Sequence, residues 1–198
     1  MTGTWVVFEG GDGVGKTTQV ERLAVWLRDH ETHVVVTREP GGTALGRDLR
    51  AAVMHGEHVA PRAEALLYAA DRAHHIHTLV RPTLERGGVV LQDRYLDSSI
   101  VYQGQARGLG DEVERISMWA TEDALPDLTI VLDMVPDPSR MGAELDRLER
   151  ETAEHAALIR EGFLELAARA PERYAVVDAA RSVDEVFEDV LSAFQRLL

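Results

Sequence analysis

The sequence predicts an α/β fold in three layers, with a five-stranded parallel sheet between two layers of helices. Helix-length segments separate the strands, and this alternation is typical of a parallel sheet built from right-handed crossovers. The strands themselves are short runs that are apolar almost throughout, as expected for strands buried on both faces. They span Trp5–Phe8, Val34–Thr37, Val89–Gln92, Leu128–Leu132 and Tyr174–Val177.

Six segments are predicted as helices: Lys16–His30, Thr43–Met54, Arg62–Arg86, Ser98–Ala124, His155–Ala170 and Val183–Leu197. The third contains Pro82, which has no backbone N–H and is expected to bend it. The charged stretch at about 136–150 follows the fourth strand and is predicted to be a short lid, because ligands of open α/β sheets bind beyond the carboxyl ends of the strands. Residues 1–198 show no repeat or linker, which predicts a single domain.

The composition excludes several classes of partner. The chain carries 21 Lys and Arg against 34 Asp and Glu, a net charge of -13, so we expect no nucleic acid and no membrane as partner. A few arginines in one cleft can still bind a phosphorylated substrate. The chain has no cysteine, which excludes disulfides and thiol catalysis. No signal-like N-terminus and no apolar run of about 18 residues occur, which predicts a soluble, cytoplasmic protein.

The single lysine of the chain, Lys16, lies between the first strand and the first helix. Arginine replaces lysine at every other basic position, and arginine is a planar fork whereas lysine is a compact point charge. Lysine at this one position therefore indicates a site that needs a point charge. The surrounding segment, Gly10-Gly11-Asp12-Gly13-Val14-Gly15-Lys16-Thr17, matches G-x-x-x-x-G-K-[ST], the phosphate-binding P-loop. The fold is therefore predicted to be of the P-loop NTPase type.

The P-loop predicts how a nucleotide phosphate donor is bound. Backbone N–H groups of the glycines and the positive end of the first helix face the phosphates, and Lys16 reaches the β- and γ-phosphates. The Thr17 hydroxyl is expected to bind Mg²⁺, together with Asp93 at the end of the third strand. The predicted ATP-binding residues are Gly10, Gly11, Asp12, Gly13, Val14, Gly15, Lys16, Thr17 and Thr18.

Other P-loop proteins fit the sequence less well. A GTPase needs an N/T-K-x-D motif for guanine, and this chain has no asparagine and no second lysine. A motor or transporter ATPase needs further domains. A small P-loop phosphotransferase remains.

Three further motifs resemble the bacterial thymidylate kinases: Thr37-Arg38-Glu39-Pro40-Gly41-Gly42, Asp93-Arg94-Tyr95-Leu96-Asp97-Ser98-Ser99 and Tyr102-Gln103-Gly104. The resemblance runs in order and spacing from Val6 to about Arg150, and more loosely to the C-terminus. It implies a nucleoside-monophosphate-kinase-like domain that transfers a phosphoryl group from Mg·ATP to dTMP, giving dTDP for dTTP biosynthesis. It also implies a homodimer, for which the apolar helix faces Ile100/Val101 and Ile116/Trp119 are candidates, although either pair fits a core equally well.

The resemblance implies roles for the acceptor-site residues. Arg50 and Arg94 grip the acceptor phosphate, Asp12 contacts the sugar 3′-hydroxyl, and Tyr102 lies against the sugar. Tyr68 stacks on thymine and Arg72 hydrogen-bonds it, and their spacing of four places both on one helix face. The implied dTMP-binding set is Asp12, Glu39, Pro40, Leu49, Arg50, Tyr68, Arg72, Arg94, Ser98, Ser99, Tyr102 and Gln103.

The sequence departs from the resemblance at the source of the catalytic arginine. One class of the family has a basic P-loop residue where this chain has Val14, so the arginine is expected from the lid, which is about one helical turn (~4 residues) shorter than usual. Arg140 or Arg147 is predicted to stabilise the transition state, and a solvated helix start is the alternative. The predicted catalytic residues are Lys16, Asp12, Arg94, Arg140 and Arg147.

Two other functions stay open at this point. One is a kinase for another nucleotide or nucleoside, such as guanylate or a deoxynucleoside. The other is a nucleotide-binding regulatory protein with little or no turnover. His74, His75 and His77 are expected on a solvated helix face rather than in a metal site, because no acidic partner has ligand spacing.

Overall fold

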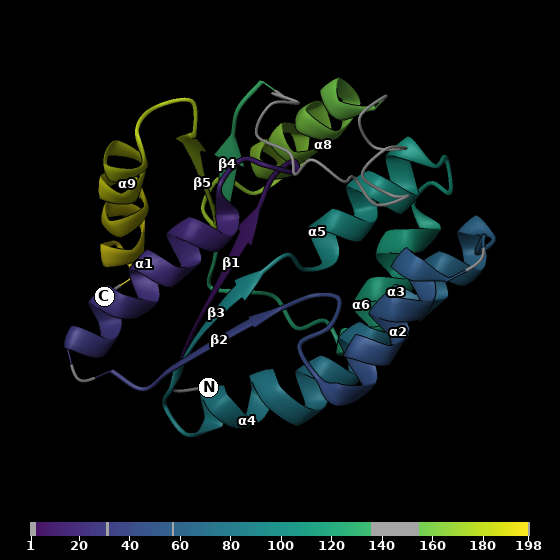
Figure 1. Cartoon of the computed structure of the whole chain (residues 1–198), viewed down its shortest axis with the longest axis horizontal. Coiled ribbons are helices and arrows are strands. Elements are labelled where there is room, and N and C mark those ends of the chain that lie inside the picture. Colours follow the sequence, from purple (N-terminus) through teal and green to yellow (C-terminus); the bar gives the residue numbers. More distant parts are fainter. Residues whose placement is uncertain (1–2, 31, 57, 136–154, 198) are drawn as a thin grey trace.

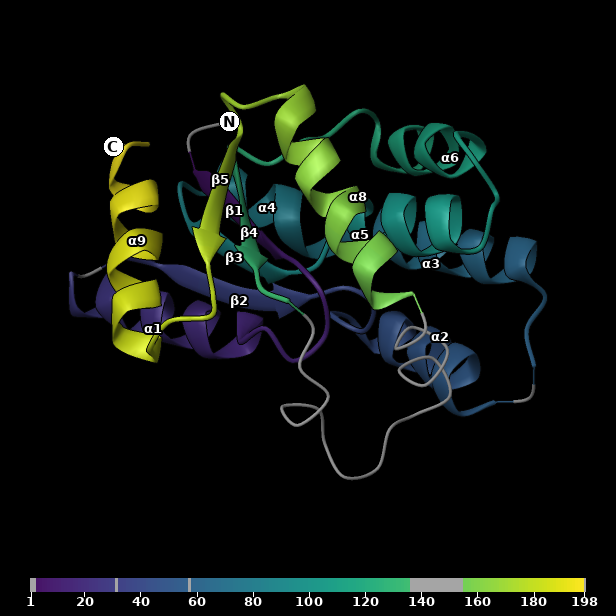
Figure 2. The ribbon, with the colours of Figure 1, turned by 90° about the horizontal axis from the view of Figure 1, so that it is seen from above.

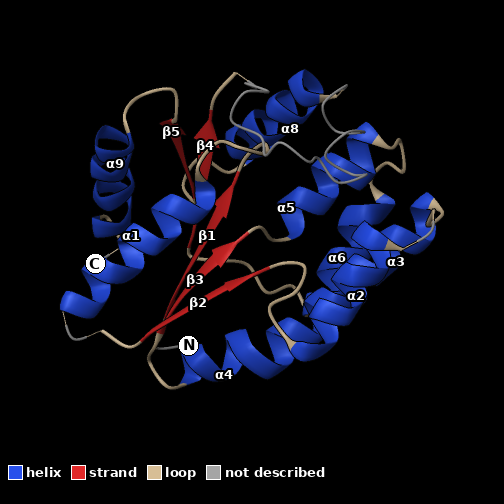
Figure 3. Ribbon diagram, in the orientation of Figure 1, coloured by secondary structure: helices blue, strands red, loops and turns tan. Residues whose placement is uncertain are grey.

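The computed structural model describes residues 3–30, 32–56, 58–135 and 155–197 (Figure 1). In these residues the sheet has five parallel strands in the order β2-β3-β1-β4-β5. The arrows in Figure 3 all point toward one edge. The strands are β1 (Thr4–Glu9), β2 (Val34–Arg38), β3 (Val89–Asp93), β4 (Leu128–Asp133) and β5 (Tyr174–Asp178).

The five predicted strands are confirmed, and each continues one residue further at its carboxyl end. The added residue is charged in every strand: Glu9, Arg38, Asp93, Asp133 and Asp178. The apolar runs stop one residue before the strands do, and the strand pairing continues to this polar edge, where Glu9 is buried and Arg38 and Asp178 are exposed. The edge therefore carries a row of charged side chains above an apolar sheet.

Helices cover both faces of the sheet, as predicted (Figure 2). The helices α1 (Lys16–Asp29) and α9 (Val183–Gln195) pack on one face, against Val6, Phe8 and Ile130. The opposite core contains Trp5, Val7 and Val90 with side chains from several helices. The helices that contribute to it include α4 (Arg81–Glu85), α5 (Leu96–Ser99) and α8 (Ala156–Arg169). Alternate residues of β1 thus enter opposite cores, which is why the whole run is apolar.

The predicted helix at Arg62–Arg86 is a continuous helical stretch with a local change of geometry. It comprises α3 (Pro61–His75), a π-helical turn η1 (Ile76–Val80) and α4. Pro82 lies in the first turn of α4, directly after the π-helical turn. The wider turn accommodates the missing proline N–H, so the irregularity precedes the proline instead of falling at it.

The prediction of one helix over Ser98–Ala124 was wrong. The chain forms α5, then a π-helical segment η2 (Ile100–Ala106), and then a separate helix α6 (Glu112–Thr121). Between them, Gly108 and Gly110 have φ angles of 69° and 68°, a left-handed conformation that ends a helix. The two helices α2 (Ala44–His55) and α6 both pack against α3.

The predicted lid at 136–150, with Arg140 and Arg147, lies outside the described residues. Within the described part of the chain, no helix is both long and apolar enough to cross a membrane.

Candidate functional site

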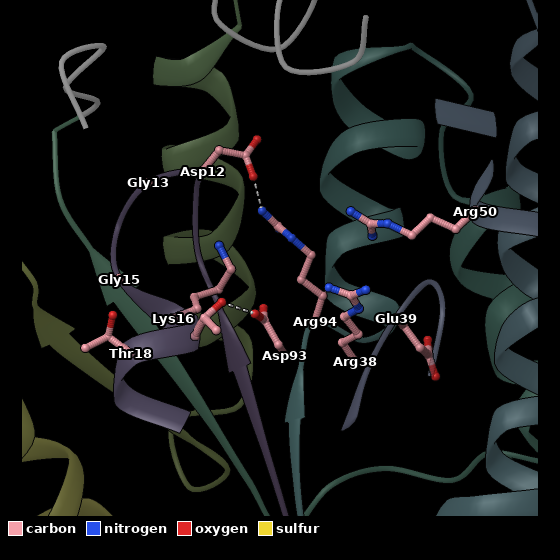
Figure 4. A pocket seen from close by; sticks show the side chains of 11 residues that line it. Asp12, Gly13, Gly15, Lys16, Thr18, Arg38, Glu39, Arg50, Asp93 and Arg94 are labelled. Carbon is pink, nitrogen blue, oxygen red and sulfur yellow. Dashed lines mark hydrogen bonds and ion pairs between the residues drawn. The ribbon is translucent and has the colours of Figure 1, made fainter. Parts of the chain in front are cut away.

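A cavity of about 340 Å³ opens at the charged edge of the sheet, where the P-loop meets β2, β3 and α2 (Figure 4). Predicted donor-site and acceptor-site residues share it, so the structure brings the two predicted sites together. Its lining residues are Asp12, Gly13, Gly15, Lys16, Thr17, Thr18, Arg38, Glu39, Arg50, Asp93 and Arg94.

Lys16 begins α1 and is almost completely buried, with 7% of its surface exposed. Its Nζ donates to the carbonyl oxygens of Gly10, at 3.1 Å, and Gly11, at 2.6 Å. Burial and the nearby Arg94 lower the pKa of Lys16 to about 8, against the opposing effect of Asp93 and Asp12. The ammonium group is therefore held inside the loop at the cavity wall, where a phosphate oxygen is its natural counter-charge.

The predicted magnesium ligands Thr17 and Asp93 lie together. The Thr17 Oγ1 donates to Asp93 Oδ2 at 2.9 Å, and Asp93 Oδ1 is buried and accepts no hydrogen bond from the described residues. A hydroxyl oxygen and a carboxylate oxygen beside a phosphate site form the hard-oxygen donor set that suits Mg²⁺. The residues present therefore fit the ion.

Asp12, Arg94 and Tyr102 form a linked group on the acceptor side of the P-loop. The Arg94 guanidinium is ion-paired with Asp12 and donates to Gly10 O at 3.1 Å. It also lies 5.2 Å from the centre of the Tyr102 ring, whose hydroxyl is 3.4 Å from Asp12 Oδ2. Burial alone raises the pKa of Asp12, but Arg94 and Lys16 outweigh it and hold that pKa below its usual value. Asp12 is therefore ionised at neutral pH.

Arg94 has a φ of 67°, which is unusual for a residue other than glycine. Two hydrogen bonds hold this conformation, from Arg94 N to Phe8 O at 2.9 Å and from Gln92 Nε2 to Arg94 O at 2.9 Å. Such a strained residue persists only where its surroundings fix it, and it is common at functional sites. The strain turns the side chain toward the P-loop.

Glu9 is a site residue that the sequence prediction missed. Its side chain is fully buried and accepts hydrogen bonds from Tyr95 N at 2.8 Å, Ser98 N at 3.1 Å and Ser98 Oγ at 2.7 Å. Ser98 Oγ in turn accepts from Arg94 at 3.0 Å. Burial and the neighbouring Asp97 raise the pKa of Glu9 to about 7, although Arg94 opposes them. A charged residue directly after an apolar strand was the available signal for Glu9.

Arg38 was also missed, although it belongs to a motif that carried the resemblance. It ends β2 opposite Asp93 of β3 and lines the cavity with Arg50 and Arg94. Figure 4 shows these three guanidinium groups on the side of the cavity facing Lys16. The position directly after a strand was again the signal for it.

Arg50 lines the cavity, whereas Tyr68 is not among its lining residues. Arg50 projects from α2 and donates to Pro40 O at 3.2 Å. Tyr68 is half-buried on α3, and burial together with Glu64 raises the pKa of its hydroxyl, against Arg50 and Arg107. Leu49 is half-buried on α2 and does not line the cavity. Val14 packs into the core, so only its backbone is available to a nucleotide.

Arg72 is buried rather than open to the cavity. Its Nε donates to Glu39 at 2.8 Å, and its other nitrogens donate to Ser117 Oγ, Tyr95 O and Ser99 Oγ. Gln103, one turn beyond Ser99, donates to Glu64 at 2.9 Å. Of the predicted dTMP-binding residues, Arg72 and Ser99 therefore lie in one buried hydrogen-bonded group, and Gln103 lies in another with Glu64.

The prediction that His74, His75 and His77 share a solvated face was wrong for His75. His77 is exposed, but His75 is completely buried, with Nδ1 at 2.8 Å from Glu39 and Nε2 at 2.7 Å from Thr37 Oγ1. The prediction grouped the three histidines by residue type and did not consider their positions around the helix axis. His75 follows Arg72 by three residues, so both lie on the inward face of α3. The described residues contain no cluster of three metal-binding side chains.

The comparisons with known proteins agree with this geometry. The family model for thymidylate kinase matches residues 8–190. The chain belongs to the thymidylate kinase family. A thymidylate kinase from Clavibacter michiganensis subsp. michiganensis is 52% identical, across 100% of this chain and 97% of that protein. A thymidylate kinase from Pelotomaculum thermopropionicum is 46% identical, across 100% of this chain and 95% of that protein.

A solved structure has the same fold. The crystal structure of thymidylate kinase from Ehrlichia chaffeensis superposes with a TM-score of 0.83 and 28% identity, covering 98% of this chain and 100% of that chain. Thymidylate kinase membership and the α/β fold predicted from the sequence are thereby confirmed.

Proposed function

We infer that this chain catalyses the ATP-dependent phosphorylation of dTMP to dTDP. The observation that carries the conclusion is the shared cavity, which is lined by the P-loop lysine, by Arg94 directly after β3 and by Arg50 of α2, in a chain of the thymidylate kinase family. Two phosphate-binding groups of residues facing one another suit direct transfer between two phosphates.

On the donor side, the backbone of Gly13 and Gly15 and the ammonium of Lys16 hold the ATP phosphates. Thr17 and Asp93 would hold Mg²⁺, which supplies positive charge to the phosphate oxygens when it is bound. The contact between Thr17 and Asp93 and the buried, unbonded Asp93 Oδ1 support this assignment.

On the acceptor side, Arg94 and Arg50 bind the dTMP phosphate, because a guanidinium binds phosphate oxygens in pairs. Arg38 adds a third positive charge to the same cavity. Asp12, ionised and beside Tyr102, accepts a hydrogen bond from the sugar 3′-hydroxyl. Tyr102 leaves less room for a 2′-hydroxyl.

Tyr68, Arg72, Ser99 and Gln103 recognise the base. Support for this assignment comes from the family match and from the hydrogen bond that joins Arg72 of α3 to Ser99 of α5. Arg140 or Arg147 is proposed as the arginine that stabilises the transition state, because Val14 leaves the P-loop without one. A cytoplasmic location and the absence of nucleic-acid partners stay predictions from the composition.

A homodimer is part of the proposal. Ile100 and Val101 are buried in the core, so they are not available to a partner. Trp119 on α6 is 82% exposed, and Leu66 on the adjoining α3 is 55% exposed. A tryptophan this exposed favours an association surface, because large apolar side chains gain most from burial.

An assay with several candidate phosphate acceptors tests the proposed function. Coupled ADP release is measured with Mg·ATP and dTMP, dUMP, dGMP, dAMP or thymidine, and the highest kcat/KM is expected for dTMP. A preference for any other acceptor would overturn the proposal, and absence of turnover with all of them would favour the regulatory alternative.

Two arginine variants of α2 refine this test. Arg50→Gln is expected to raise KM for dTMP about tenfold, because a charged hydrogen-bond donor to phosphate is lost. Arg47→Gln on the exposed side of the same helix is the matched control and is expected to leave KM unchanged.

A further inference from the structure

The turn that follows β2 contains the buried carboxylate of Glu39, which contacts Arg72 and His75. The side chain of Glu39 is 3% exposed. Its Oε2 accepts from Arg72 Nε at 2.8 Å, and its Oε1 lies 2.8 Å from His75 Nδ1. Arg72 and His75 are three residues apart on α3, so both reach Glu39 from one helix face. Glu39 is therefore held at both oxygens.

The neutral tautomer of His75 with its proton on Nδ1 satisfies both hydrogen bonds of the ring. An ionised carboxylate only accepts, so Nδ1 carries the proton and donates to Glu39. In the neutral imidazole, Nε2 is then an acceptor, and Thr37 Oγ1 donates to it across 2.7 Å. The imidazole thus connects the end of β2 to the carboxylate of Glu39.

The backbone of the turn at Gly41 and Gly42 packs closely against the His75 imidazole. A Cβ added to Gly42 would lie 2.5 Å from Thr37 Oγ1 and 2.7 Å from His75 Nε2, closer than any side chain fits. Gly41 N also donates to Asp71 Oδ2 at 3.3 Å. The backbone of the turn and the side chain of Glu39 therefore take their positions from α3, and His75 contacts both.

The position of Arg72 depends on Glu39 in turn. Within the described part of the chain, acceptors are present for four of the five N–H groups of Arg72, on Glu39, Ser117, Tyr95 and Ser99. One N–H of Nη1 has no acceptor among the described residues. Because the guanidinium is planar, fixing Nε by Glu39 also fixes the direction of that N–H.

We propose that His75 is a positioning residue for acceptor recognition, which holds Glu39 and thereby sets the Arg72 guanidinium that binds the pyrimidine base. This inference rests on the proposed function, since it assigns the base to Arg72. It predicts that loss of the His75–Glu39 hydrogen bond weakens dTMP binding while donor binding and the chemical step change little, because Lys16 and Arg94 are held by other contacts.

Two substitutions separate the two nitrogens of the imidazole. In His75→Asn the side-chain amide nitrogen takes the place of Nδ1 and keeps a donor for Glu39. In His75→Gln the amide nitrogen takes the place of Nε2 and reaches Thr37 instead. His77→Gln, on the exposed side of the same helical stretch, is the matched control. KM for dTMP, KM for ATP and kcat are measured for each, with thermal unfolding as a check of folding.

His75→Gln is expected to raise KM for dTMP about tenfold, with kcat and KM for ATP within about twofold of wild type. His75→Asn is expected to recover most of the loss, and His77→Gln to match wild type. A wild-type KM in His75→Gln, or equal losses in the Gln and Asn variants, would overturn the inference.

Thr37→Val provides a second test if His75→Gln does not fold. It removes the hydroxyl that holds Nε2 and leaves the His75–Glu39 bond, so a rise of a few-fold in KM for dTMP is expected. An unchanged KM would count against the inference. The wild-type protein tests the underlying function separately: without dTMP turnover the proposed function fails, whereas turnover with unaffected variants contradicts the role of His75 alone.

Discussion

Lys16 and Arg94 are two buried cations that share the carbonyl oxygen of Gly10. Lys16 Nζ and Arg94 Nη1 each lie 3.1 Å from that oxygen. The loop backbone limits the space around the Lys16 ammonium group, because the carbonyl oxygen of Gly11 lies 2.6 Å from Nζ. A guanidinium is wider than an ammonium and delocalised, so it does not fit this position. Lysine is therefore required by the loop geometry in a chain that otherwise uses arginine.

Lys16→Arg is expected to lower kcat by a factor on the order of 10²–10³ while leaving the fold intact, because the charge no longer reaches the donor phosphates. Steady-state kinetics measures the loss, and circular dichroism with thermal unfolding checks the fold. Arg28→Lys, the reverse exchange at an exposed position of α1, is the control and is expected to keep wild-type activity. Near-normal turnover of Lys16→Arg would show that the loop accepts either cation.

The end of β1 is joined to α5 by a buried carboxylate. Glu9 accepts from the backbone of Tyr95 and Ser98 and from the Ser98 hydroxyl, which in turn orients Arg94. Asp97 of α5 is also buried, and burial raises its pKa to about 6. Two buried acids beside each other cannot both ionise without cost, so this junction between strand and helix responds to pH.

This junction predicts how stability changes with pH. Glu9 has a pKa of about 7 in the folded chain and an ordinary value of 4.5, so between these values the folded chain binds more protons than the unfolded chain. Its contribution to the unfolding free energy is complete below about pH 4.5 and is lost as the pH rises toward 7. The loss is at most about 1.4 kcal/mol per pH unit for one proton.

Glu9→Gln removes the titrating group. The unfolding free energy of this variant is therefore expected to fall less steeply from pH 5 to pH 7 than that of the wild-type protein. Urea denaturation at several pH values measures the slopes. Glu161→Gln, at an exposed position of α8, is the control and is expected to keep the wild-type slope. Parallel curves for Glu9→Gln and wild type would exclude Glu9 as the titrating group.

At the scale of the whole molecule, the adjoining helices α3 and α6 each expose a large apolar side chain. Trp119 and Leu66 are exposed there, whereas Trp5 is buried in the core. The third tryptophan, Trp26, packs against the core beside Phe194. Burying an exposed tryptophan in a second copy stabilises a dimer, which is the assembly proposed above.

Trp119→Glu is expected to shift the protein from dimer to monomer, because a carboxylate at the centre of an apolar contact is costly to bury. Sedimentation velocity over a range of protein concentrations measures the shift. Val25→Glu on α1 replaces another exposed apolar residue outside this surface and is expected to leave the oligomeric state unchanged. A Trp119→Glu protein that sediments like wild type would place the contact elsewhere, or show a monomer.

The sequence determined those parts of the protein that depend on local pattern. Apolar runs predicted the five strands. The central strands β1, β3 and β4 are buried on both faces and need apolar side chains almost throughout, whereas the edge strands β2 and β5 are apolar although part of each is exposed. The P-loop was predicted because its glycines, lysine and threonine act within one turn of the chain. The resemblance supplied Arg50 and Arg94, and both line the cavity.

Only the tertiary structure decided the contacts between distant residues. Glu9 meets Ser98, and His75 meets Glu39 and Thr37, across sequence separations that no periodicity encodes. The break at Gly108 and Gly110 depends on positive φ angles that residue types alone leave open. The physical reason is that a buried polar group is stable only when hydrogen-bonded, and its partners come from whichever strands and helices the fold brings together.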